Sequence, residues 1–354
     1  MFAMAPPAHW DLFCRVVDNL GDAGVCWRLA AALGRRGQPV RLWIDDPAPL
    51  AWMAPGGAPG VTVVPWTEPA ADLMPGAVVI EAFGCDPPAG FVARMAQRLP
   101  APVWINLEYL SAEPYVERSH RLPSPQFSGP GAGLSKWFFY PGFTPATGGL
   151  LRDDTTVGDA EARAWLRQQG WGPAEGERLV VVFCYHNPAL PGLLAVLADR
   201  PTRLLVPPGP AQAQLKEGPL PARLRWTALP HLPQPDFDRL LAASDLNLVR
   251  GEDSFVRAQV GARQPFLWQV YPQGDGAHAA KLEAFLDRYL AGAAPADAAA
   301  VRRAFRGFNG LAPLPAHLPE DSAWRAIHLA WRAGLLAQDD LCTQLLRFVD
   351  VRSR

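Results

Sequence analysis

Two carboxylates and two glycines lie in one short stretch near the start of the chain, Asp18-Asn19-Leu20-Gly21-Asp22-Ala23-Gly24. The residues before it, from Trp10 on, are mainly apolar, and an apolar helical pattern begins at Val25, so a strand, a tight loop and a helix are predicted. Loops at the carboxyl ends of parallel strands face the ligand crevice of an open sheet, which makes Asp18 and Asp22 candidates for acid and base chemistry. The alternative is that an Asp caps the helix beside a turn glycine, although one helix needs only one cap.

A second polar cluster, Arg250-Gly251-Glu252-Asp253-Ser254, follows an apolar run in the second half of the chain. Asp253 or Ser254 would be the N-cap of the next helix, and Gly251 would let the backbone turn and approach a ligand. Arg250 places a fork of donors beside the free N–H groups of the helix start, which suits the oxygens of a diphosphate. Glu252 would repel phosphate but could reach a neutral sugar or a cationic acceptor. The alternative is a capped helix with a local Arg–Asp pair.

Aromatic residues lie at the end of the first strand predicted in the second half. Phe183 and Tyr185 are two residues apart, so they share one face of that strand and could stack on a nucleobase, although aromatic residues on strands more often belong to the core. Asp236-Phe237-Asp238 has the DxD spacing that can hold a metal–nucleotide complex, but its place at a helix start favours capping. The chain has no GxxxxGKS/T run and its first loop is not GxGxxG, which argues against an ATPase and a dehydrogenase.

These clusters need strands and helices to position them, and the first half of the chain supplies an alternating pattern. Helices are expected over 23–37 and 89–98, and apolar runs predict strands at 40–44, 61–64, 77–80 and 103–107. Apolar strands that alternate with helices predict a parallel sheet covered on both faces. Residues 111–149 are expected to be mostly loop, with a hinge at Gly148 and Gly149.

The second half of the chain repeats this architecture. Strands are predicted at 179–185, 203–206, 224–229, 246–250 and 266–271, and helices at 190–199, 237–243, 254–262, 279–290, 298–305, 322–333 and 339–349. We therefore expect an α/β protein with two doubly wound domains and a ligand cleft between them. The expected boundaries are 1–151 for the N-terminal domain, 152–176 for a linker, 177–320 for the C-terminal domain, and 321–354 for helices that pack back on the N-terminal domain.

Composition narrows the class of partner. The 354-residue chain has 33 basic and 34 acidic residues and a formal net charge of −1, and no basic run indicates binding to nucleic acid or to an anionic membrane. Its five cysteines are an odd number and lie mostly in apolar runs, as expected of buried thiols in a reducing compartment. Neither a signal-peptide pattern nor an apolar stretch of membrane-spanning length is present in this sequence, so a cytoplasmic protein is expected.

Further motifs follow one another along the chain: VVDNLGDAGVCWRLA, INLEYLSAE, LPSPQ, TGGLL, VFCYHNP, LNLVRGEDSFVRAQ and WQVYPQ. From Trp10 to about Leu290 they resemble the elongation factor P arginine rhamnosyltransferases, the EarP family. The resemblance implies a GT-B glycosyltransferase fold with two Rossmann-like domains facing a cleft. It also implies transfer of L-rhamnose from dTDP-β-L-rhamnose to an arginine of elongation factor P, with inversion. The N-terminal domain would then take the acceptor and the C-terminal domain the nucleotide sugar.

The resemblance also implies roles for single residues. Asp18 and Asp22 resemble the family's essential aspartates and Glu252 its essential glutamate, so these three are the catalytic candidates. The donor-binding candidates are Phe183, Tyr185 and Gln234 for the base, Arg250, Asp253 and Ser254 for the diphosphate, and Asn19 and Gly21 from the first loop. The chain departs from the family pattern at Ala23 and His186, and neither departure removes a group that the mechanism needs.

The expected chemistry suits these residue types. A guanidinium is a stable cation that must lose a proton before or during attack on the sugar carbon. Two carboxylates can grip it, orient one nitrogen and take the proton, with Asp22 as the expected base and Asp18 as the expected positioning residue. Arg250 and the helix start would stabilise the charge on the departing dTDP, so neither a metal nor another cofactor is expected.

Three other functions are compatible with the residues. The first is another inverting GT-B glycosyltransferase with a non-protein acceptor, which would leave elongation factor P unmodified. The second is a nucleotide-sugar epimerase, which would convert the donor with no acceptor present. The third is a nucleotide-binding module without catalysis, in which Asp22→Asn would change no activity.

Overall fold

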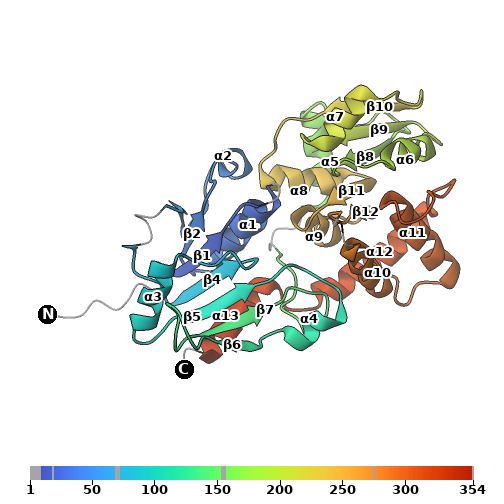
Figure 1. Cartoon of the computed structure of the whole chain (residues 1–354). Helices are drawn as coiled ribbons and strands as arrows, with labels where there is room; N and C mark the ends of the chain where they lie inside the picture. The colour runs from blue at the N-terminus through green and yellow to red at the C-terminus, as the bar shows by residue number, and fades with distance from the viewer. Residues whose placement is uncertain are drawn as a thin grey trace. The chain divides into compact units, whose positions relative to one another are not determined.

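A computed structural model describes residues 9–17, 20–67, 72–152, 157–272, 274 and 276–352 of the chain. The chain divides into two compact units, and Figure 1 shows the elements of both. Unit 1 comprises Met1–Asp153 together with Gln338–Arg354, and unit 2 comprises Asp154–Ala337. The polypeptide therefore leaves unit 1 once and returns to it near its C-terminal end.

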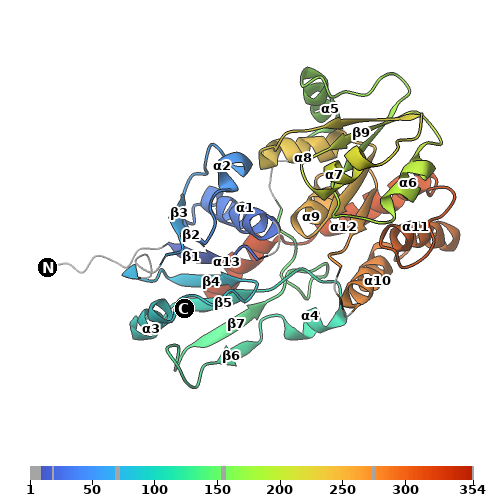
Figure 2. The same ribbon diagram turned by 45° about the horizontal axis from the view of Figure 1, so that its top comes forward.

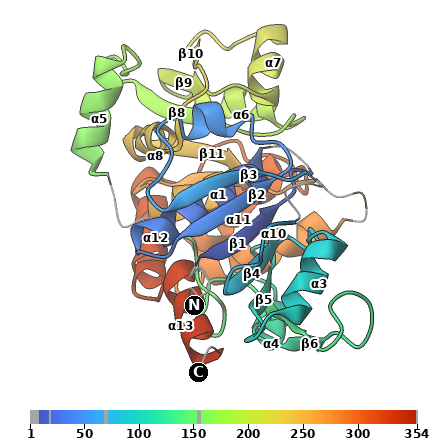
Figure 3. The same ribbon diagram turned by 90° about the vertical axis from the view of Figure 1, so that its left-hand side faces the viewer.

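Unit 1 is built on a seven-stranded sheet in the order β3-β2-β1-β4-β5-β7-β6, and Figure 3 shows the neighbouring strands from β3 to β5 in this order. All neighbours run parallel except β6 and β7. The strands are β1 (Trp10–Cys14), β2 (Val40–Ile44), β3 (Val61–Pro65), β4 (Val78–Ala82), β5 (Val103–Leu107), β6 (Pro123–Pro125) and β7 (Ser135–Phe139). The four strands expected after the first loop are therefore confirmed with ends shifted by at most two residues.

Helices cover both faces of this sheet (Figure 2). They are α1 (Gly21–Arg35), α2 (Leu50–Met53), α3 (Ala89–Gln97), α4 (Pro114–Ser119) and α13 (Leu341–Arg352). α1 and α13 pack on one face, where Leu29 and Phe348 belong to the same apolar core. α3 packs on the other face, where Phe91 contacts the stacked rings of Phe13 and Trp43. A sheet covered on both faces is what its apolar strands require.

The segment 111–149 is mostly loop, as expected, but it also includes short regular elements. It contains α4, β6 and β7, and β7 pairs in parallel with β5. A Cβ at Gly148 would lie 2.5 Å from the Phe139 ring, and a Cβ at Gly149 would lie 2.4 Å from the Asp339 carbonyl oxygen. The predicted hinge is therefore wrong, because these glycines allow close packing inside unit 1.

Unit 2 contains a five-stranded parallel sheet in the order β10-β9-β8-β11-β12. Its strands are β8 (Arg178–Val182), β9 (Thr202–Val206), β10 (Leu224–Ala228), β11 (Leu246–Arg250) and β12 (Phe266–Gln269). Its helices are α5 (Asp159–Gln168), α6 (Leu190–Leu197), α7 (Pro210–Glu217), α8 (Gln234–Ala243), α9 (Asp253–Val260), α10 (Ala277–Tyr289), α11 (Pro295–Phe308) and α12 (Asp321–Leu336). Both units are therefore doubly wound and Rossmann-like, as predicted.

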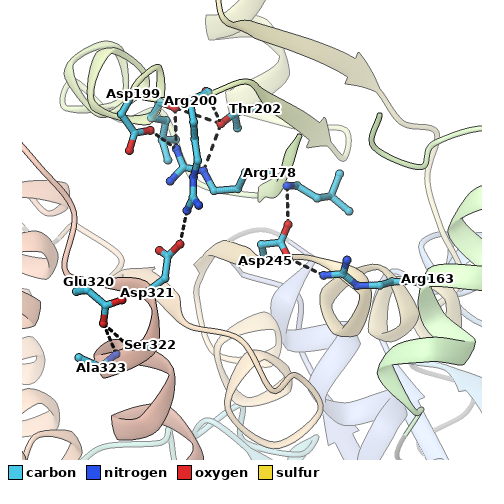
Figure 4. A network of polar contacts seen from close by, with 12 residues as sticks. Arg163, Arg178, Asp199, Arg200, Thr202, Asp245, Glu320, Asp321, Ser322 and Ala323 are labelled. Atoms are coloured by element: carbon cyan, nitrogen blue, oxygen red, sulfur yellow. Dashed lines mark hydrogen bonds and ion pairs between the residues drawn. The ribbon is translucent and has the colours of Figure 1, made fainter. Parts of the chain in front are cut away.

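Polar contacts attach α5 and α12 to the strand beginnings of unit 2 (Figure 4). Arg163 of α5 contacts Asp245 at 2.5 Å, and the other oxygen of Asp245 accepts the Leu179 N–H at 2.8 Å. Asp321 of α12 pairs with Arg200, which precedes β9. The expected linker therefore includes a helix of unit 2, and of the two last helices only α13 belongs to unit 1.

Two simpler expectations concern cysteine and membrane segments. All five cysteines are buried and free, as predicted from their apolar neighbourhoods. No helix in the described part of the chain combines the length and the apolar composition that crossing a bilayer requires.

Candidate functional site

The carboxyl end of β1 leads into the first candidate loop, of which Asp18 and Asn19 lie outside the described residues. Asp22 is buried in the first turn of α1, and its Oδ2 accepts a hydrogen bond from the Val17 N–H at 3.3 Å. The N-cap of α1 is Leu20, which makes no side-chain cap bond. Asp22 is thus not the helix cap that the alternative explanation requires. Gly21 begins α1, and a Cβ added to it would meet no atom within 4 Å.

A second carboxylate stands directly after β5, at the edge of the sheet where the parallel strands β1, β4 and β5 all end. Glu108 is half-buried, and its Oε1 accepts a hydrogen bond from Asn106 Nδ2 at 2.7 Å. Burial raises the pKa of Glu108, and the bond from Asn106 and the charge of Lys136 oppose this effect only in part. A cation that approached Glu108 would therefore stabilise its ionised form.

Aromatic side chains accompany this carboxylate. The rings of Phe83 and Tyr109 stack at 4.2 Å, and those of Tyr115 and Tyr140 meet edge to face at 5.8 Å. Burial, followed by the charge of Glu108, raises the pKa of Tyr140 to about 12. We call Phe83, Glu108, Tyr109, Tyr115 and Tyr140 the β5-end cluster. A carboxylate among aromatic rings suits a guanidinium, which pairs with the first and stacks on the second.

Phe83 supports a functional role for this edge. Its φ of 58° lies in the left-handed region, which a bulky residue rarely adopts, and residues of this kind gather at functional sites. The site prediction includes no member of the β5-end cluster, although Glu108 and Tyr109 belong to the motif INLEYLSAE. The signal that could have found them is their position, a carboxylate and an aromatic residue directly after an apolar parallel strand.

In unit 2, Arg250 ends β11 and lies against two aromatic rings. Its guanidinium carbon is 4.4 Å from the ring centroid of Phe183 and 4.8 Å from that of Tyr185. Burial lowers the pKa of Arg250, yet an arginine stays charged in proteins. β8 ends at Val182, three residues earlier than predicted, and Phe183 and Tyr185 still reach the same cation, in agreement with their predicted common face. Their stacking on a nucleobase stays a prediction.

The turn after Arg250 depends on glycine for two reasons. Gly251 has φ 60°, and a Cβ on it would lie 3.0 Å from the Tyr185 hydroxyl oxygen. The Ser254 hydroxyl accepts the Arg250 N–H at 3.1 Å and donates to the Arg250 carbonyl at 2.6 Å. Ser254 therefore closes the turn from the helix side, and a direct contact of this residue with phosphate stays a prediction.

The start of α9 differs from the prediction in the residue at its N-cap. The N-cap position belongs to Glu252 and carries no side-chain cap bond, while Asp253 and Ser254 are the first two helical residues. The prediction that Asp253 or Ser254 caps the helix is therefore wrong. Because the helix starts next to Arg250, the N–H groups of its first turn and one guanidinium belong to the same short segment, as binding an anion requires.

The other candidates of unit 2 lie on α8. Gln234 is the first residue of this helix and is buried, and its contact with a donor base stays a prediction. Asp236 pairs with Arg239 at 2.8 Å, and Asp238 pairs with Arg257 at 3.0 Å. The DxD carboxylates thus have arginine partners inside unit 2. The predicted capping role is wrong, because the N-cap of α8 is Pro233 and carries no side-chain cap bond.

Comparisons with known proteins point to one family. The family model described as "Elongation-Factor P (EF-P) rhamnosyltransferase EarP" matches residues 10–350. The chain is similar to a protein-arginine rhamnosyltransferase of Pseudomonas aeruginosa, with 43% identity over 96% of this chain and 98% of the relative. It is also similar to the one from Shewanella oneidensis, with 36% identity over 97% of this chain and 98% of the relative.

A solved structure supports the same assignment. This structure is described under the words "EarP-mediated arginine glycosylation of translation elongation factor EF-P". The match covers 96% of this chain and 98% of the solved chain, with 32% sequence identity and a TM-score of 0.65. Its length, like that of the relatives, is covered almost completely. The chain therefore belongs to the EarP family of protein-arginine rhamnosyltransferases, and it is an enzyme with the GT-B glycosyltransferase fold.

Proposed function

We propose that this enzyme transfers L-rhamnose from dTDP-β-L-rhamnose to an arginine side chain of translation elongation factor P, with inversion at the sugar carbon and without a metal ion. The proposed donor site rests on the position of Arg250. Its guanidinium lies against the rings of Phe183 and Tyr185, and the residue belongs to the short turn that precedes α9. A cation, aromatic faces and helix N–H groups together suit a nucleoside diphosphate. Elongation factor P is the protein named both for the matching family and for the solved relative.

The acceptor side of the proposal rests on unit 1. A guanidinium that enters this unit would meet carboxylates from two strand ends, Asp22 after β1 and Glu108 after β5. Asp18 precedes Asp22 by four residues in the sequence and lies outside the described residues. Paired N–H bonds to carboxylates neutralise the cation and aim one nitrogen, and stacking on Tyr109 would hold its plane. We assign Asp22 as the base, Asp18 as a positioning residue, and Glu108 as a further ligand of the guanidinium.

The proposed step is a single displacement. One guanidinium nitrogen attacks C1 of rhamnose from the face opposite the diphosphate, so the C–N bond forms as the bond from C1 to the diphosphate oxygen breaks. The nitrogen loses one proton to Asp22, and dTDP leaves with the electron pair of the broken bond. Arg250 and the start of α9 stabilise the charge on the leaving group, while Glu252, at the N-cap of α9, contacts the sugar or the acceptor. Attack from the opposite face inverts C1.

The test is a transfer assay with purified components. The enzyme is incubated with dTDP-β-L-rhamnose and elongation factor P in the presence of EDTA, and intact mass and fragment spectra locate any added deoxyhexose. We expect one rhamnose on one arginine, an unchanged rate with EDTA, and an α-linked product by NMR. The matched control is elongation factor P with that arginine replaced by lysine.

Each part of the proposal has its own contrary result. No mass shift on elongation factor P would overturn the acceptor, and a retained β-linkage would overturn inversion. A rate that EDTA abolishes and Mg²⁺ restores would overturn metal independence. Equal use of UDP-rhamnose would overturn the preference for thymidine.

A further inference from the structure

The Arg250–Glu252 turn needs a group that holds it in place. Gly251 permits φ 60°, but glycine adopts positive and negative φ about equally and so does not enforce this conformation. Ser254 holds the Arg250 end of the turn through two hydrogen bonds. The Gly251 carbonyl, on the other side of the turn, is held from β12, the strand that pairs in parallel with β11.

Trp268 supplies the contact to this carbonyl. Its indole Nε1–H donates to the Gly251 carbonyl oxygen at 2.8 Å. A buried indole N–H needs a hydrogen-bond partner, and the Gly251 carbonyl oxygen is the partner of the Trp268 N–H. Rotation of the peptide after Gly251 would break this bond, and the bond therefore selects one of the conformations that glycine allows.

Trp268 itself has little freedom to move. Its ring stacks on Phe255 at 3.8 Å and 9°, and it meets Phe285 of α10 edge to face at 5.6 Å. Asn309 fixes the strand end, because its Nδ2 donates to the Trp268 carbonyl at 2.8 Å and its Oδ1 accepts the Val270 N–H at 3.0 Å. Phe255 lies in α9, shortly after the turn. The Trp268 side chain therefore contacts both the turn, at Gly251, and the helix that follows it, at Phe255.

The same strand end reaches the loop that carries Tyr185. Gln269 Nε2 donates to the His186 carbonyl oxygen at 3.4 Å. Tyr185 in turn would touch any Cβ placed on Gly251. The loops after β8 and β11 are thus both attached to adjacent residues at the end of β12. Of these two attachments, the bond from Trp268 is the one that reaches the turn between Arg250 and the start of α9.

We infer that Trp268 is a positioning residue of the donor site, which holds the Arg250–Glu252 turn through the Gly251 carbonyl in the conformation that a nucleoside diphosphate binds. This inference rests on the proposed function for the identity of that diphosphate. Trp268 itself does not touch the donor. It acts by keeping the guanidinium of Arg250 and the first N–H groups of α9 in a fixed arrangement before the donor arrives.

The test compares two Trp→Phe variants of the full-length enzyme. Trp268→Phe removes the N–H but keeps an aromatic ring on Phe255. Trp331→Phe is the matched control, because Trp331 Nε1 also donates a 2.8 Å hydrogen bond, to Gln259 Oε1 in the same unit. Amide hydrogen exchange of residues 250–256 is measured without ligand, and dTDP affinity by calorimetry. The donor KM, acceptor KM and kcat complete the comparison.

We expect Trp268→Phe to exchange faster over residues 250–256, to bind dTDP roughly three- to tenfold more weakly, and to raise the donor KM in parallel. Its acceptor KM should stay unchanged, and Trp331→Phe should match the wild type in exchange, dTDP affinity and donor KM. A merely structural role for Trp268 would lower the thermal midpoint without separating the donor KM from the acceptor KM.

Unchanged exchange at the turn, or faster exchange with unchanged dTDP affinity, would overturn the inference. A different failure belongs to the proposed function. If the wild-type enzyme binds no dTDP while Trp268→Phe still loosens the turn, the proposed donor is wrong and the holding role of Trp268 stands.

Discussion

Asp22 and Glu108 lie at the carboxyl edge of the unit 1 sheet, whereas Arg250 and the first turn of α9 lie at the carboxyl edge of the unit 2 sheet. Both edges are built by parallel strands, and aromatic rings accompany the charged groups at both. Their charges are opposite. One edge is suited to a cation and the other to an anion.

The two edges together show that the architecture fixes where a ligand can bind but not which ligand binds. Parallel strands bring their last residues to one edge in both units. Single side chains then decide the charge of the ligand that can bind, since a carboxylate at this position stabilises a cation and an arginine stabilises an anion. Variants that change one edge should therefore leave binding at the other edge intact, and the following predictions test this independence.

The largest effect is expected for Asp22→Asn. Loss of the proposed base should slow rhamnose transfer about a thousandfold, while dTDP affinity stays within about twofold because the proposed donor-binding residues belong to unit 2. Initial rates by mass spectrometry and calorimetry of dTDP check both values. Asp45→Asn is the control. Asp45 Oδ1 accepts at 2.9 Å the N–H of Val16, the residue before the Val17 that donates to Asp22, and Asp45 is exposed. A comparable loss of rate in both variants would show that the local fold, not the Asp22 carboxylate, is affected.

Arg250→Lys should affect the other edge. Lysine keeps the charge but loses the planar fork and its stacking on the rings, so dTDP affinity should fall roughly tenfold to a hundredfold. The donor KM should rise with it and the acceptor KM should not. Arg225→Lys serves as the control, since Arg225 lies on β10 of the same sheet and pairs with Glu177. The independence of the two edges fails if Arg250→Lys also raises the acceptor KM.

Glu108→Gln should raise the acceptor KM by about tenfold and leave dTDP affinity unchanged, because it removes one charge from the proposed guanidinium site. Burial raises the pKa of Glu108 above its ordinary value of 4.5, so in the wild type the carboxylate becomes protonated at a higher pH than an ordinary glutamate. The acceptor KM should therefore rise as the pH falls through this raised pKa, and Glu108→Gln should lack this rise. Glu117→Gln, on α4 of the same unit, should retain it.

The smallest effect on activity is expected for Asp340→Asn, which changes neither edge. Arg36, directly after α1, pairs with Asp340 through two bonds of 2.8 and 3.0 Å. Burial raises the pKa of Asp340, but the bonds from Arg36 and Thr343 outweigh it and leave the pKa lowered. The stability from this pair is thus present above the ordinary pKa of an aspartate and is lost as the pH falls through the lowered value.

For Asp340→Asn we expect the free energy of unfolding in urea to fall by about 1–2 kcal/mol at neutral pH, with kcat and both KM values unchanged. Asp321→Asn breaks the more exposed pair with Arg200 in unit 2 and should cost less than about 0.5 kcal/mol. Equal losses in the two variants would mean that burial of the Arg36–Asp340 pair adds nothing.

Much of the fold could be predicted because buried parallel strands are continuous apolar runs. β11 is predicted at its observed bounds, Leu246–Arg250, and β2 likewise at Val40–Ile44. β7 is not predicted, since it lies among the prolines and glycines of 111–149, and its pairing with β5 is a contact between distant residues. A return of the C-terminal helices to the N-terminal domain is predicted for 321–354, but only Gln338–Arg354 belongs to unit 1, because the packing that keeps α12 in unit 2 is tertiary and local patterns do not encode it.

The candidate site could be predicted in part. Phe183, Tyr185 and Arg250 are predicted candidates because they follow apolar strands, and they do lie together. Glu108 is absent from the prediction because a single carboxylate after a strand, with no second charged residue or glycine beside it, is not a recognisable site motif. Trp268 is absent for another reason, since a tryptophan in an apolar run is typical of a core, and only the 2.8 Å bond to Gly251 reveals its second role.

The return of the chain to unit 1 has a consequence for the order of events on the ribosome. Leu341, Leu345 and Phe348 of α13 belong to the core that also holds α1, and the Leu341 N–H donates to the Leu150 carbonyl. Unit 2 has all of its residues once Ala337 has been synthesised, whereas part of the apolar face of unit 1 stays uncovered until Gln338–Arg354 follows. Synthesis therefore supplies the last residues of unit 2 before the last residues of unit 1.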